Sequence, residues 1–297
     1  MAFSPSDERA HEPEDDAHWV ESWSFDFAQG GGPNASGGPA GVGGFVRLVL
    51  LPAQRAAWYW ASLVGPDFGS VVVRDLEVPM PRRLTDADLA VRSDALWAEV
   101  VCETPFEHWG LGLEAFGLRV DDPRDDRGER VAVGLDLEWE VVAPPFEYDD
   151  RYSHAGIVHG ELLVGPDHFP FAGRGVRDHE WGEVGWLRDP PWQRGWCCIG
   201  DELAIEVVVD GEGFEGWTWQ IGEPPVAIED ALVETHGGAG RWVLNHEVEI
   251  EWDVIAEASV PLADGADAPR LARSLATATT DRGATGVGWL ESLDGRF

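Results

Sequence analysis

The sequence predicts an all-β fold made of two consecutive antiparallel β-barrels or sandwiches. Three observations support this: apolar and polar residues alternate along many short segments, glycine-rich turns separate those segments, and helical spacing is scarce. Strands with one apolar and one polar face are typical of antiparallel sheets that bury one side. Two halves of roughly 130 residues suit eight-stranded barrels, whose interiors hold side chains or one small ligand.

The first half opens with a polar, acidic stretch. Residues 1–18 show no periodicity, and we expect them to form a disordered arm. The N-terminal domain is expected over residues 19–145, beginning with a strand in which Trp23, Phe25 and Phe27 alternate with polar residues. A glycine-rich loop follows this strand. Further strands are expected at 45–52, 56–64, 70–78, 96–104, 108–120 and 131–142.

The alternation stops around residues 143–156, where proline, acidic and aromatic residues cluster. We therefore predict a domain boundary there and a C-terminal domain over residues 146–297. Its clearest strand is 246–254, in which apolar and acidic residues alternate. The best helical windows of the chain are short ones, at 82–90 and 224–233. Further strands are expected at 157–165, 168–176, 196–211, 216–222 and 285–293.

The charge balance is strongly acidic. The chain has 55 acidic and 21 basic residues, a formal net charge of −34, and contains no lysine. Such a surface repels nucleic acid and anionic membranes, so neither is expected as a partner. Two explanations remain open. A salt-rich cytoplasm screens the repulsion between carboxylates, whereas a GC-rich genome replaces lysine by arginine and raises the glycine and proline content.

Localisation is expected to be cytoplasmic. No apolar stretch approaches the ~20 residues of a membrane helix, and the amino terminus has neither the basic nor the apolar region of a signal peptide. The cysteines are Cys102, Cys197 and Cys198. Neighbouring residues on a strand point to opposite faces, so the vicinal pair is a poor candidate for a disulfide, and a reducing compartment is the simpler inference.

No cofactor is expected. The sequence lacks a P-loop, a dinucleotide-binding fingerprint in strand–helix context and a nucleophile elbow. His154, His159 and His168 are spaced too loosely for a metal motif such as H-E-x-x-H, so no metal site is expected either. The sequence does not determine the oligomeric state.

The densest group of reactive and aromatic residues lies at 173–198. It contains Arg174, Arg177, Asp178 and His179 together with four tryptophans and several glycines. Adjacent aspartate and histidine offer acid and base groups, tryptophans supply flat apolar walls, and glycines permit bulges and close backbone approach. The sequence therefore predicts its candidate site here.

The run from Gly175 to Gly182 resembles the Gly-x-x-Asp-His-x-Trp-Gly signature of the carotenoid 1,2-hydratase and AttH-like family. The closing segment, residues 285–293, is similar to that family's Gly-x-Gly-aromatic-x-Glu strand. These two motifs cover a small fraction of the chain, which resembles an acidic member of the family. The resemblance implies two consecutive lipocalin-like β-domains, the second carrying the signature, and an apolar small-molecule ligand. Glu180 departs from the amide frequent in the family, which weakens the transfer of activity.

The resemblance also implies a chemistry. A hydratase of an isolated alkene must protonate carbon, which requires a carboxylic acid kept neutral in a dry pocket and aromatic faces that stabilise the cation. Asp178 matches that acid, His179 would orient it or deliver water, and Glu291 would share its proton. Trp181 and Trp186 would wall the cation.

The same resemblance places further residues at the ligand. Arg177, Trp196 and Trp289 are expected to line the apolar site together with the two tryptophans of the signature. In a regular strand Asp178 and His179 face opposite sides, so both enter one pocket only if a glycine bulge intervenes.

Three functional alternatives remain. The first is an enzyme, a hydratase, isomerase or cyclase that acts through Asp178 on an isoprenoid, steroid or lipid-like molecule. The second is a non-catalytic carrier of such ligands, in which Asp178 and His179 only brace the barrel through hydrogen bonds to Arg174 and Arg177. The third is a carbohydrate-binding or glycoside-cleaving protein, suggested by the 16 tryptophans and many carboxylates.

Overall fold

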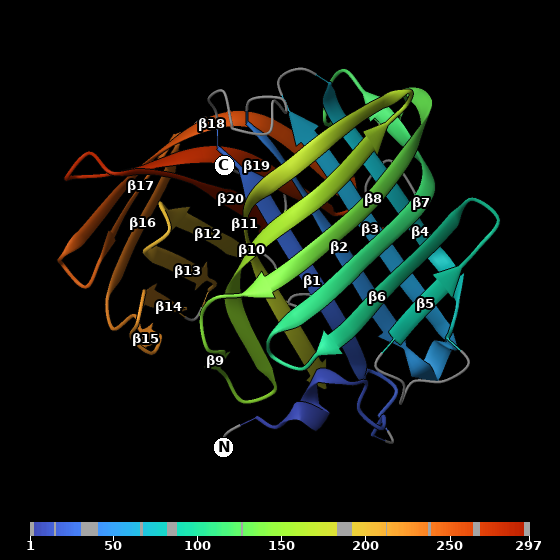
Figure 1. Cartoon of the computed structure of the whole chain (residues 1–297), viewed down its shortest axis with the longest axis horizontal. Coiled ribbons are helices and arrows are strands. Elements are labelled where there is room, and N and C mark those ends of the chain that lie inside the picture. The colour runs from blue at the N-terminus through green and yellow to red at the C-terminus, as the bar shows by residue number, and fades with distance from the viewer. Residues whose placement is uncertain are drawn as a thin grey trace.

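The computed structural model describes residues 3–14, 16–30, 41–65, 68–81, 88–125, 127–182, 192–211, 213–236, 239–263 and 268–293. It consists of two antiparallel β-sheets that pack against each other, and this confirms the predicted all-β fold (Figure 1). Helical structure among the described residues is limited to two 3-10 turns, Pro5–Glu8 and Pro52–Gln54. No described helix has the length and apolar character needed to cross a membrane.

The first sheet contains eleven strands, and most of them close into a barrel. Their order is β4-β3-β2-β1-β11-β10-β8-β7-β6-β5, with β9 paired to β10, and β4 also pairs with β7. The strands are β1 (Val20–Gln29), β2 (Val42–Leu51), β3 (Ala56–Gly65), β4 (Gly69–Pro79), β5 (Asp88–Arg92), β6 (Leu96–Thr104), β7 (His108–Val120), β8 (Glu129–Val141), β9 (Phe146–Glu147), β10 (Arg151–Val164) and β11 (Asp167–Gly182).

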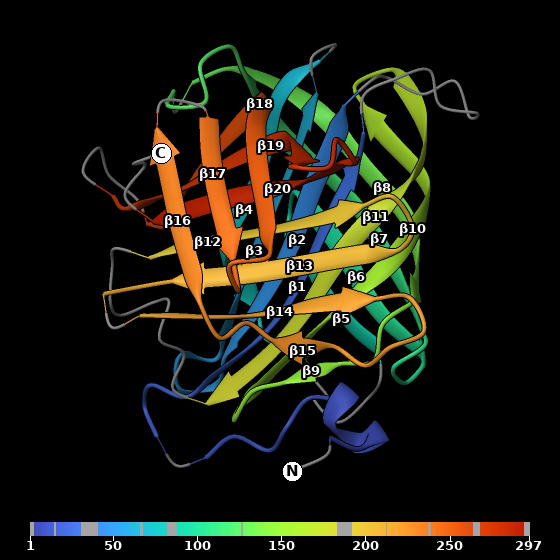
Figure 2. The same cartoon turned by 90° about the vertical axis from the view of Figure 1, so that its left-hand side faces the viewer.

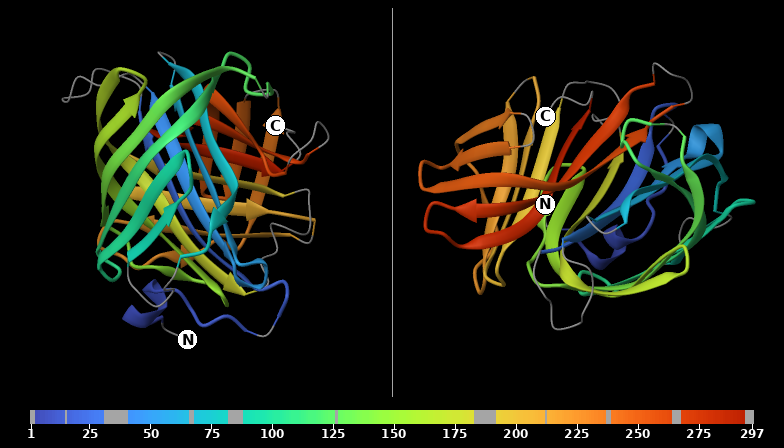
Figure 3. Two further views of the ribbon diagram at one scale, coloured as in Figure 1. Left: turned by 90° about the vertical axis from the view of Figure 1, so that its right-hand side faces the viewer. Right: turned by 90° about the horizontal axis from the view of Figure 1, so that it is seen from above.

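Closure of this barrel depends on strand β7. Its first part, His108–Ala115, pairs with β6, and its last part, residues 118–120, pairs with β4. The β5–β6 hairpin therefore completes the barrel wall over the length along which β4 and β7 are not paired. Seen along its axis, the first sheet forms a ring beside the second sheet (Figure 3). Such a barrel leaves no long unpaired edge around most of its circumference.

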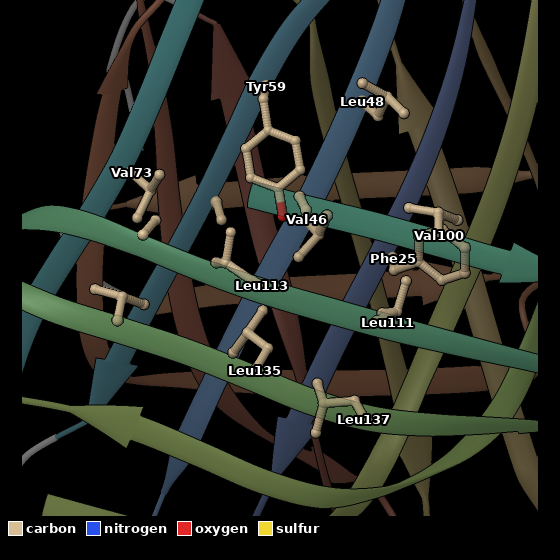
Figure 4. Packing of buried hydrophobic residues seen from close by; sticks show 14 of the residues in the cluster. Phe25, Val46, Leu48, Tyr59, Val73, Val100, Leu111, Leu113, Leu135 and Leu137 are labelled. Carbon is tan, nitrogen blue, oxygen red and sulfur yellow. The ribbon is translucent and has the colours of Figure 1, made fainter. Parts of the chain in front are cut away.

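The barrel interior is apolar. Along each strand, every second side chain points inward. Among them are the predicted Trp23, Phe25 and Phe27, all of which are fully buried. Aliphatic side chains from opposite walls face each other, as Leu113 and Val46 do in Figure 4. Each fully buried large apolar side chain contributes about 1.5–3 kcal/mol, so this interior is the largest single source of stability in the first barrel.

The second sheet contains nine strands in the order β15-β14-β13-β12-β20-β19-β18-β17-β16. Strands β12 to β14 run across β16 to β18, so the sheet folds over a core of its own (Figure 2). Trp242 and Trp252 pack together in that core, with ring centroids 4.8 Å apart. The strands are β12 (Gln193–Ile199), β13 (Leu203–Val209), β14 (Phe214–Gln220), β15 (Val226–Ala227), β16 (Ala231–His236), β17 (Ala239–Leu244), β18 (Val248–Pro261), β19 (Arg270–Thr280) and β20 (Thr285–Leu293).

Glycines in β20 allow close backbone approach to β12. A Cβ atom on Gly286 would lie 2.0 Å from the carbonyl oxygen of Cys198, and one on Gly288 would lie 1.8 Å from that of Trp196. Any larger residue at either position would push the two strands apart. The Gly-x-Gly element of the closing motif therefore has a packing role between these strands.

Three details of the predicted organisation are corrected. Strands β10 and β11 belong to the first sheet, so the division between sheets falls after residue 182 and not at residue 146. Within the first residues, expected to be disordered, residues 3–11 contact one end of the first barrel and Glu8 is fully buried, whereas residues 12–14 and 16–18 are exposed (Figure 1). The window at 224–233 forms β15 and the start of β16, because tertiary pairing outweighs weak helical spacing.

Candidate functional site

The signature segment lies on β11, in regular pairing on both sides. From Arg174 to Glu180 its register is continuous with β1 on one edge and with β10 on the other, and no bulge interrupts it. Successive side chains therefore alternate between faces. Arg177, His179 and Trp181 face the inside of the first barrel and its end, whereas Asp178 faces the second sheet. The single site predicted from adjacent residues is thus divided into two places.

On the outer face, between the two sheets, charged groups form one buried network. Six of its groups are joined by successive ion pairs, and Arg151 pairs with Asp178 and with the half-exposed Glu215. Arg273 Nη2 contacts Asp26 Oδ1 at 2.5 Å, and Arg194 Nε donates to Glu206 Oε1 at 2.6 Å. Its members are Asp26, Asp178, Glu206, Glu291, Arg47, Arg151, Arg194 and Arg273.

Apolar clusters lie on both sides of this network. One joins Trp196, Trp217 and Trp289 of the second sheet to Ala155 and Val176 of the first. The other lies among the buried residues Val20, Phe45, Val49, Leu51, Trp60, Trp192, Val260, Leu262, Leu271 and Leu293. Water is therefore kept from the ion pairs, and their mutual attraction is stronger than at a surface.

Asp178 differs from the other acids of the network. Its Oδ2 lies 3.2 Å from Arg151 Nε, and burial raises the pKa of its carboxyl group although Arg151 and Arg194 oppose that shift. Burial also acts on Glu206, but the guanidinium groups of Arg194 and Arg151 hold the pKa of Glu206 below its ordinary value. Asp178 is consequently the acid of this pair that more readily carries a proton.

The other residues expected around Asp178 have different partners. Glu291 is ion-paired with Arg273 and lies 3.7 Å from Arg47, and it does not pair with Asp178. Trp289 donates from Nε1 to the carbonyl oxygen of Phe27 at 2.9 Å, which fastens β20 to β1. Trp196 packs in the apolar cluster between the sheets. Trp186 lies outside the described residues.

On the inner face, a second polar cluster closes one end of the barrel. The Tyr152 hydroxyl donates to Glu8 Oε1 at 2.7 Å and lies 3.1 Å from His179 Nδ1. Arg177 Nη1 donates to the same Glu8 oxygen at 2.8 Å and contacts His154 Nε2 at 3.0 Å. All five side chains are buried, so the cluster joins the N-terminal segment to β10 and β11.

This inner cluster continues to Glu21 at the start of β1. Glu21 Oε1 lies 3.0 Å from His179 Nε2 and 2.7 Å from His11 Nδ1. The backbone amide of His11 also donates to this carboxylate, at 3.0 Å. Trp181 stacks on the His11 ring with centroids 4.0 Å apart, and Phe3 lies against Trp181 at 5.5 Å.

The environment shifts the pKa values of this cluster in different directions. Burial raises the pKa of Glu8, but the neighbouring Arg177 outweighs it, so the carboxyl group stays ionised. Burial, together with Arg177, lowers the pKa of His154 to about 3, which keeps that ring neutral. Burial likewise lowers the pKa of His179. Glu8 and Arg177 therefore form a buried ion pair flanked by neutral imidazoles.

Sequence reasoning missed the residues that complete this inner cluster. Glu8 and His11 lie in a segment without periodicity, and Tyr152 lies in the region interpreted as a domain boundary. Only Glu21 offered a signal, as an acidic residue within an otherwise clear strand. The cluster depends on contacts between residues more than 140 positions apart, such as Glu8 and Tyr152, and local patterns do not reveal them.

Tyr59 places a hydroxyl group inside the first barrel. Tyr59 on β3 is 1% exposed, and its hydroxyl points between the walls of the barrel, among Val46, Val73 and Leu113 (Figure 4). Burial raises its pKa, so the phenol is neutral. None of the described residues hydrogen-bonds to this hydroxyl, and the indole N–H groups of Trp23, Trp109 and Trp139 in the same core cluster also lack a partner.

The model of a family described as a domain of unknown function, DUF7064, matches residues 4–296. The chain belongs to this family. The match includes both sheets, the N-terminal segment and the signature on β11. No curated protein sequence matches the chain.

Several solved structures share the fold of this DUF7064 protein. The AttH-like protein NE1406 of Nitrosomonas europaea has a TM-score of 0.72 at 14% identity, covering 100% of this chain and 98% of its own. Kievitone hydratase of Nectria haematococca has 0.59 at 9% identity, covering 99% and 93%. CghA with Sch210972 has 0.54 at 13% identity, covering 99% and 96%. These identities show the fold alone, and the predicted AttH-like, double lipocalin-like architecture is confirmed.

Proposed function

We propose that this DUF7064 protein binds one apolar small molecule inside its first barrel and contacts an oxygen of that molecule with Tyr59. The observation that carries the proposal is the unpartnered Tyr59 hydroxyl within a closed, apolar barrel. Barrels of about eight strands enclose an interior that suits side chains or one small ligand. An oxygen atom on the ligand would satisfy the hydroxyl without burying a further charge.

The side chains that line the barrel interior restrict the chemical class of the ligand. The interior is formed by aliphatic and aromatic side chains from β1 to β11, and its polar groups include Tyr59, the indole N–H groups of Trp23, Trp109 and Trp139, and the cluster around Arg177 at one end. Sugars carry a hydroxyl on most carbons and would leave many hydrogen bonds unmade there. An isoprenoid, steroid or lipid-like alcohol or ketone fits this pattern better. Carbohydrate binding is accordingly the weakest of the three alternatives.

The test compares two ligands and one conservative variant. Tryptophan fluorescence of the full chain would be titrated with a polycyclic or isoprenoid alcohol and with the hydrocarbon of the same skeleton. We expect saturable quenching by both, and a loss of roughly 5–10-fold in affinity for the alcohol alone in Tyr59→Phe, because one hydrogen bond contributes about 1 kcal/mol.

Tyr148→Phe is the matched control, since Tyr148 is also largely buried but lies outside the barrel, beneath Arg151. Equal effects of Tyr59→Phe on alcohol and hydrocarbon would contradict the proposal. So would quenching by oligosaccharides alone.

A second candidate function is proton transfer to an alkene by Asp178. Its support is the raised pKa of Asp178 beside the tryptophans between the sheets, together with the fold shared with kievitone hydratase. An acid whose pKa is raised donates its proton to carbon more readily than one that stays ionised. Because Asp178 faces away from the barrel interior, this chemistry requires the substrate to lie between the sheets.

Incubation with alkene-containing ligands in deuterated water tests this second function. We expect deuterium incorporation by the natural protein and none by Asp178→Asn, with binding and circular dichroism preserved. Incorporation that survives in Asp178→Asn would assign the activity elsewhere. If binding persists and no turnover occurs in either protein, the carrier function stands and the enzymatic one fails.

A further inference from the structure

The inner cluster contains a group of residues that the functions proposed above do not use. His11, Glu21 and His179 bring two imidazole nitrogens and one carboxylate together at the end of the first barrel, with donor atoms within 4.8 Å of one another. We infer that these three side chains bind one divalent transition-metal ion, with zinc as the best match, and that the ion fastens the N-terminal segment to the barrel.

The first argument is geometric. His11 Nδ1 and His179 Nε2 both point at the same oxygen, Glu21 Oε1, from 2.7 and 3.0 Å. Zinc binds nitrogen and oxygen ligands at roughly 2.0–2.2 Å in tetrahedral arrangement, which places ligand atoms about 3–3.5 Å apart. The observed separations are slightly shorter, so small side-chain rotations suffice to admit an ion.

The second argument is a count of hydrogen atoms. Three short contacts form a chain: Glu8 Oε1 to the Tyr152 hydroxyl, that hydroxyl to His179 Nδ1, and His179 Nε2 to Glu21 Oε1. Tyr152 carries one hydrogen on its oxygen, and a neutral imidazole carries one on its nitrogens. Only two hydrogen atoms are available for three contacts. In one contact, therefore, two lone pairs would face each other with no hydrogen between them.

A metal ion removes this conflict. His179 then donates from Nδ1 to Tyr152, Tyr152 donates to Glu8, and the ion lies between His179 Nε2 and Glu21. Ligating histidines usually hydrogen-bond through their second nitrogen to a neighbouring group, which is the role Tyr152 would have here. The alternative that would supply the third hydrogen is an imidazolium at His179.

The local charge is compatible with a cation. Glu8 and Arg177 neutralise each other, and the carboxylates of Glu21 and of Asp7, which lies 3.7 Å from His11 Nε2, remain to attract a cation. Two imidazoles and one carboxylate form the ligand set of many zinc sites. Trp181 stacks on His11 and Trp23 stacks on His179, with centroids 4.0 and 4.5 Å apart, so both rings are held in orientation.

The ion would have a mechanical consequence. His11 belongs to the segment at residues 3–14, whereas Glu21 and His179 belong to the barrel wall. A metal that binds all three joins the segment to the wall at a second point, in addition to the Glu8–Arg177 pair. Occupancy would therefore govern how firmly this end of the barrel is closed.

The experiment uses the full chain after dialysis against a chelator. Zn²⁺ alone would be titrated calorimetrically, and Co²⁺ would be added separately to read the ligand field from visible absorption. We expect one Zn²⁺ per chain, and at least a roughly 10-fold weaker affinity in His11→Ala, which removes a ligand from the exposed side of the site.

His108→Ala is the matched control. Glu103, His108 and Glu138 form the other group of possible ligands in the described chain, but Glu103 and Glu138 are at least 40% exposed. Binding that is lost in His108→Ala and kept in His11→Ala would overturn the inference. So would a natural protein that binds neither ion.

A nitrogen-15 NMR measurement on the natural protein gives an answer that does not depend on variants. In the metal-free protein we expect the His179 signals to move when one equivalent of Zn²⁺ is added, with Nε2 showing the shift of a metal-bound nitrogen. Signals of a doubly protonated His179 that persist in excess Zn²⁺ would instead assign the missing hydrogen to an imidazolium and overturn the metal site.

Discussion

Buried charges are compensated differently on the two faces of strand β11. On the outer face, carboxylates pair with guanidinium groups, and all of these residues come from strands of the two sheets. On the inner face, Arg177 relies on Glu8, which is supplied by a segment outside both sheets. The outer network is therefore part of the tertiary structure itself, whereas the inner cluster is complete only when the N-terminal segment is in place.

This difference shows why a compact sequence motif is not the same as one site. Asp178 and His179 are neighbours in sequence, yet the strand places their side chains on opposite sides of a wall. One then takes part in joining the two sheets, and the other in closing a barrel end.

The largest expected effect comes from breaking the outer network. Arg273→Met removes the shorter ion pair of both Asp26 and Glu291, and leaves these buried carboxylates only the longer contacts with Arg194 at 3.3 Å and Arg47 at 3.7 Å. Loss of one partner from a buried ion pair typically costs about 3–5 kcal/mol. We expect a decrease of that size in the free energy of unfolding, measured by urea denaturation.

Arg241→Met provides the control for Arg273→Met. Arg241 also pairs with a glutamate, Glu249, but at the surface, so little change is expected. Similar losses in the two variants would refute the distinction between network and surface pairs.

A smaller effect separates two acids of the same network. Glu206→Gln removes the charge that Arg194 and Trp217 contact, and we expect it to lower the free energy of unfolding by about 2–3 kcal/mol. Asp178→Asn replaces a carboxyl group whose pKa is already raised, so a loss below about 1 kcal/mol is expected. Parallel urea melts of the two variants provide the measurement. If Asp178→Asn costs as much as Glu206→Gln, Asp178 is a structural ion and a poor proton donor.

A substitution at Gly175 tests how tightly the inner face of β11 is packed. A Cβ atom at Gly175 would lie 2.2 Å from the Trp139 ring and 2.4 Å from the carbonyl oxygen of Asp26. Gly175→Ala should therefore lower the free energy of unfolding by about 1–3 kcal/mol through overpacking. Gly213→Ala, where a Cβ meets no neighbour, is the control and should change stability little. Equal stability of both variants in thermal melts would show that the barrel interior yields easily at Trp139.

Lowering the pH tests the contribution of the Glu8 charge in the inner cluster. The pKa of Glu8 in the folded protein lies below its ordinary value, so the ionised group stabilises the folded state. That contribution is complete above the ordinary glutamate pKa of about 4.3 and is lost as the pH falls through the lower, folded-state value. Comparison of the natural protein with Glu8→Gln should show a stability difference at pH 7 that narrows below about pH 4.

Urea melts between pH 7 and pH 3 measure this difference, and Glu12→Gln on the exposed part of the same segment serves as control. A difference that stays constant with pH would mean that the Glu8 charge contributes nothing to the attachment of the segment.

Most of the fold was predictable because alternation is a local signal. The stretch at 131–142 corresponds to β8, and Trp23, Phe25 and Phe27 all point into the barrel as their alternation predicted. The grouping of strands was not predictable in this way. A polar interruption at 143–156 resembles a linker, but β9 and the start of β10 within it remain hydrogen-bonded to the first sheet.

The candidate site was predictable only in part. The segment around Asp178 does carry buried charged groups, and the geometric warning that Asp178 and His179 would face opposite sides is confirmed. Glu291 and Trp289 were expected beside Asp178, whereas Glu291 pairs with Arg273 and Trp289 anchors to Phe27. Which charges pair across 100 or more residues depends on sheet topology, and no single segment contains that information.

The pairing of β1 with β11 also constrains how the protein is made. Glu21 and Trp181 are paired although 160 positions separate them in the sequence. During translation, roughly 10–30 s therefore pass between the synthesis of β1 and that of its second neighbour, β11. The hairpins of β2, β3 and β4 can form in that interval, but the barrel cannot close. During synthesis the edge of β1, which carries Trp23, Phe25 and Phe27, therefore stays unpaired and open to aggregation until β11 is made.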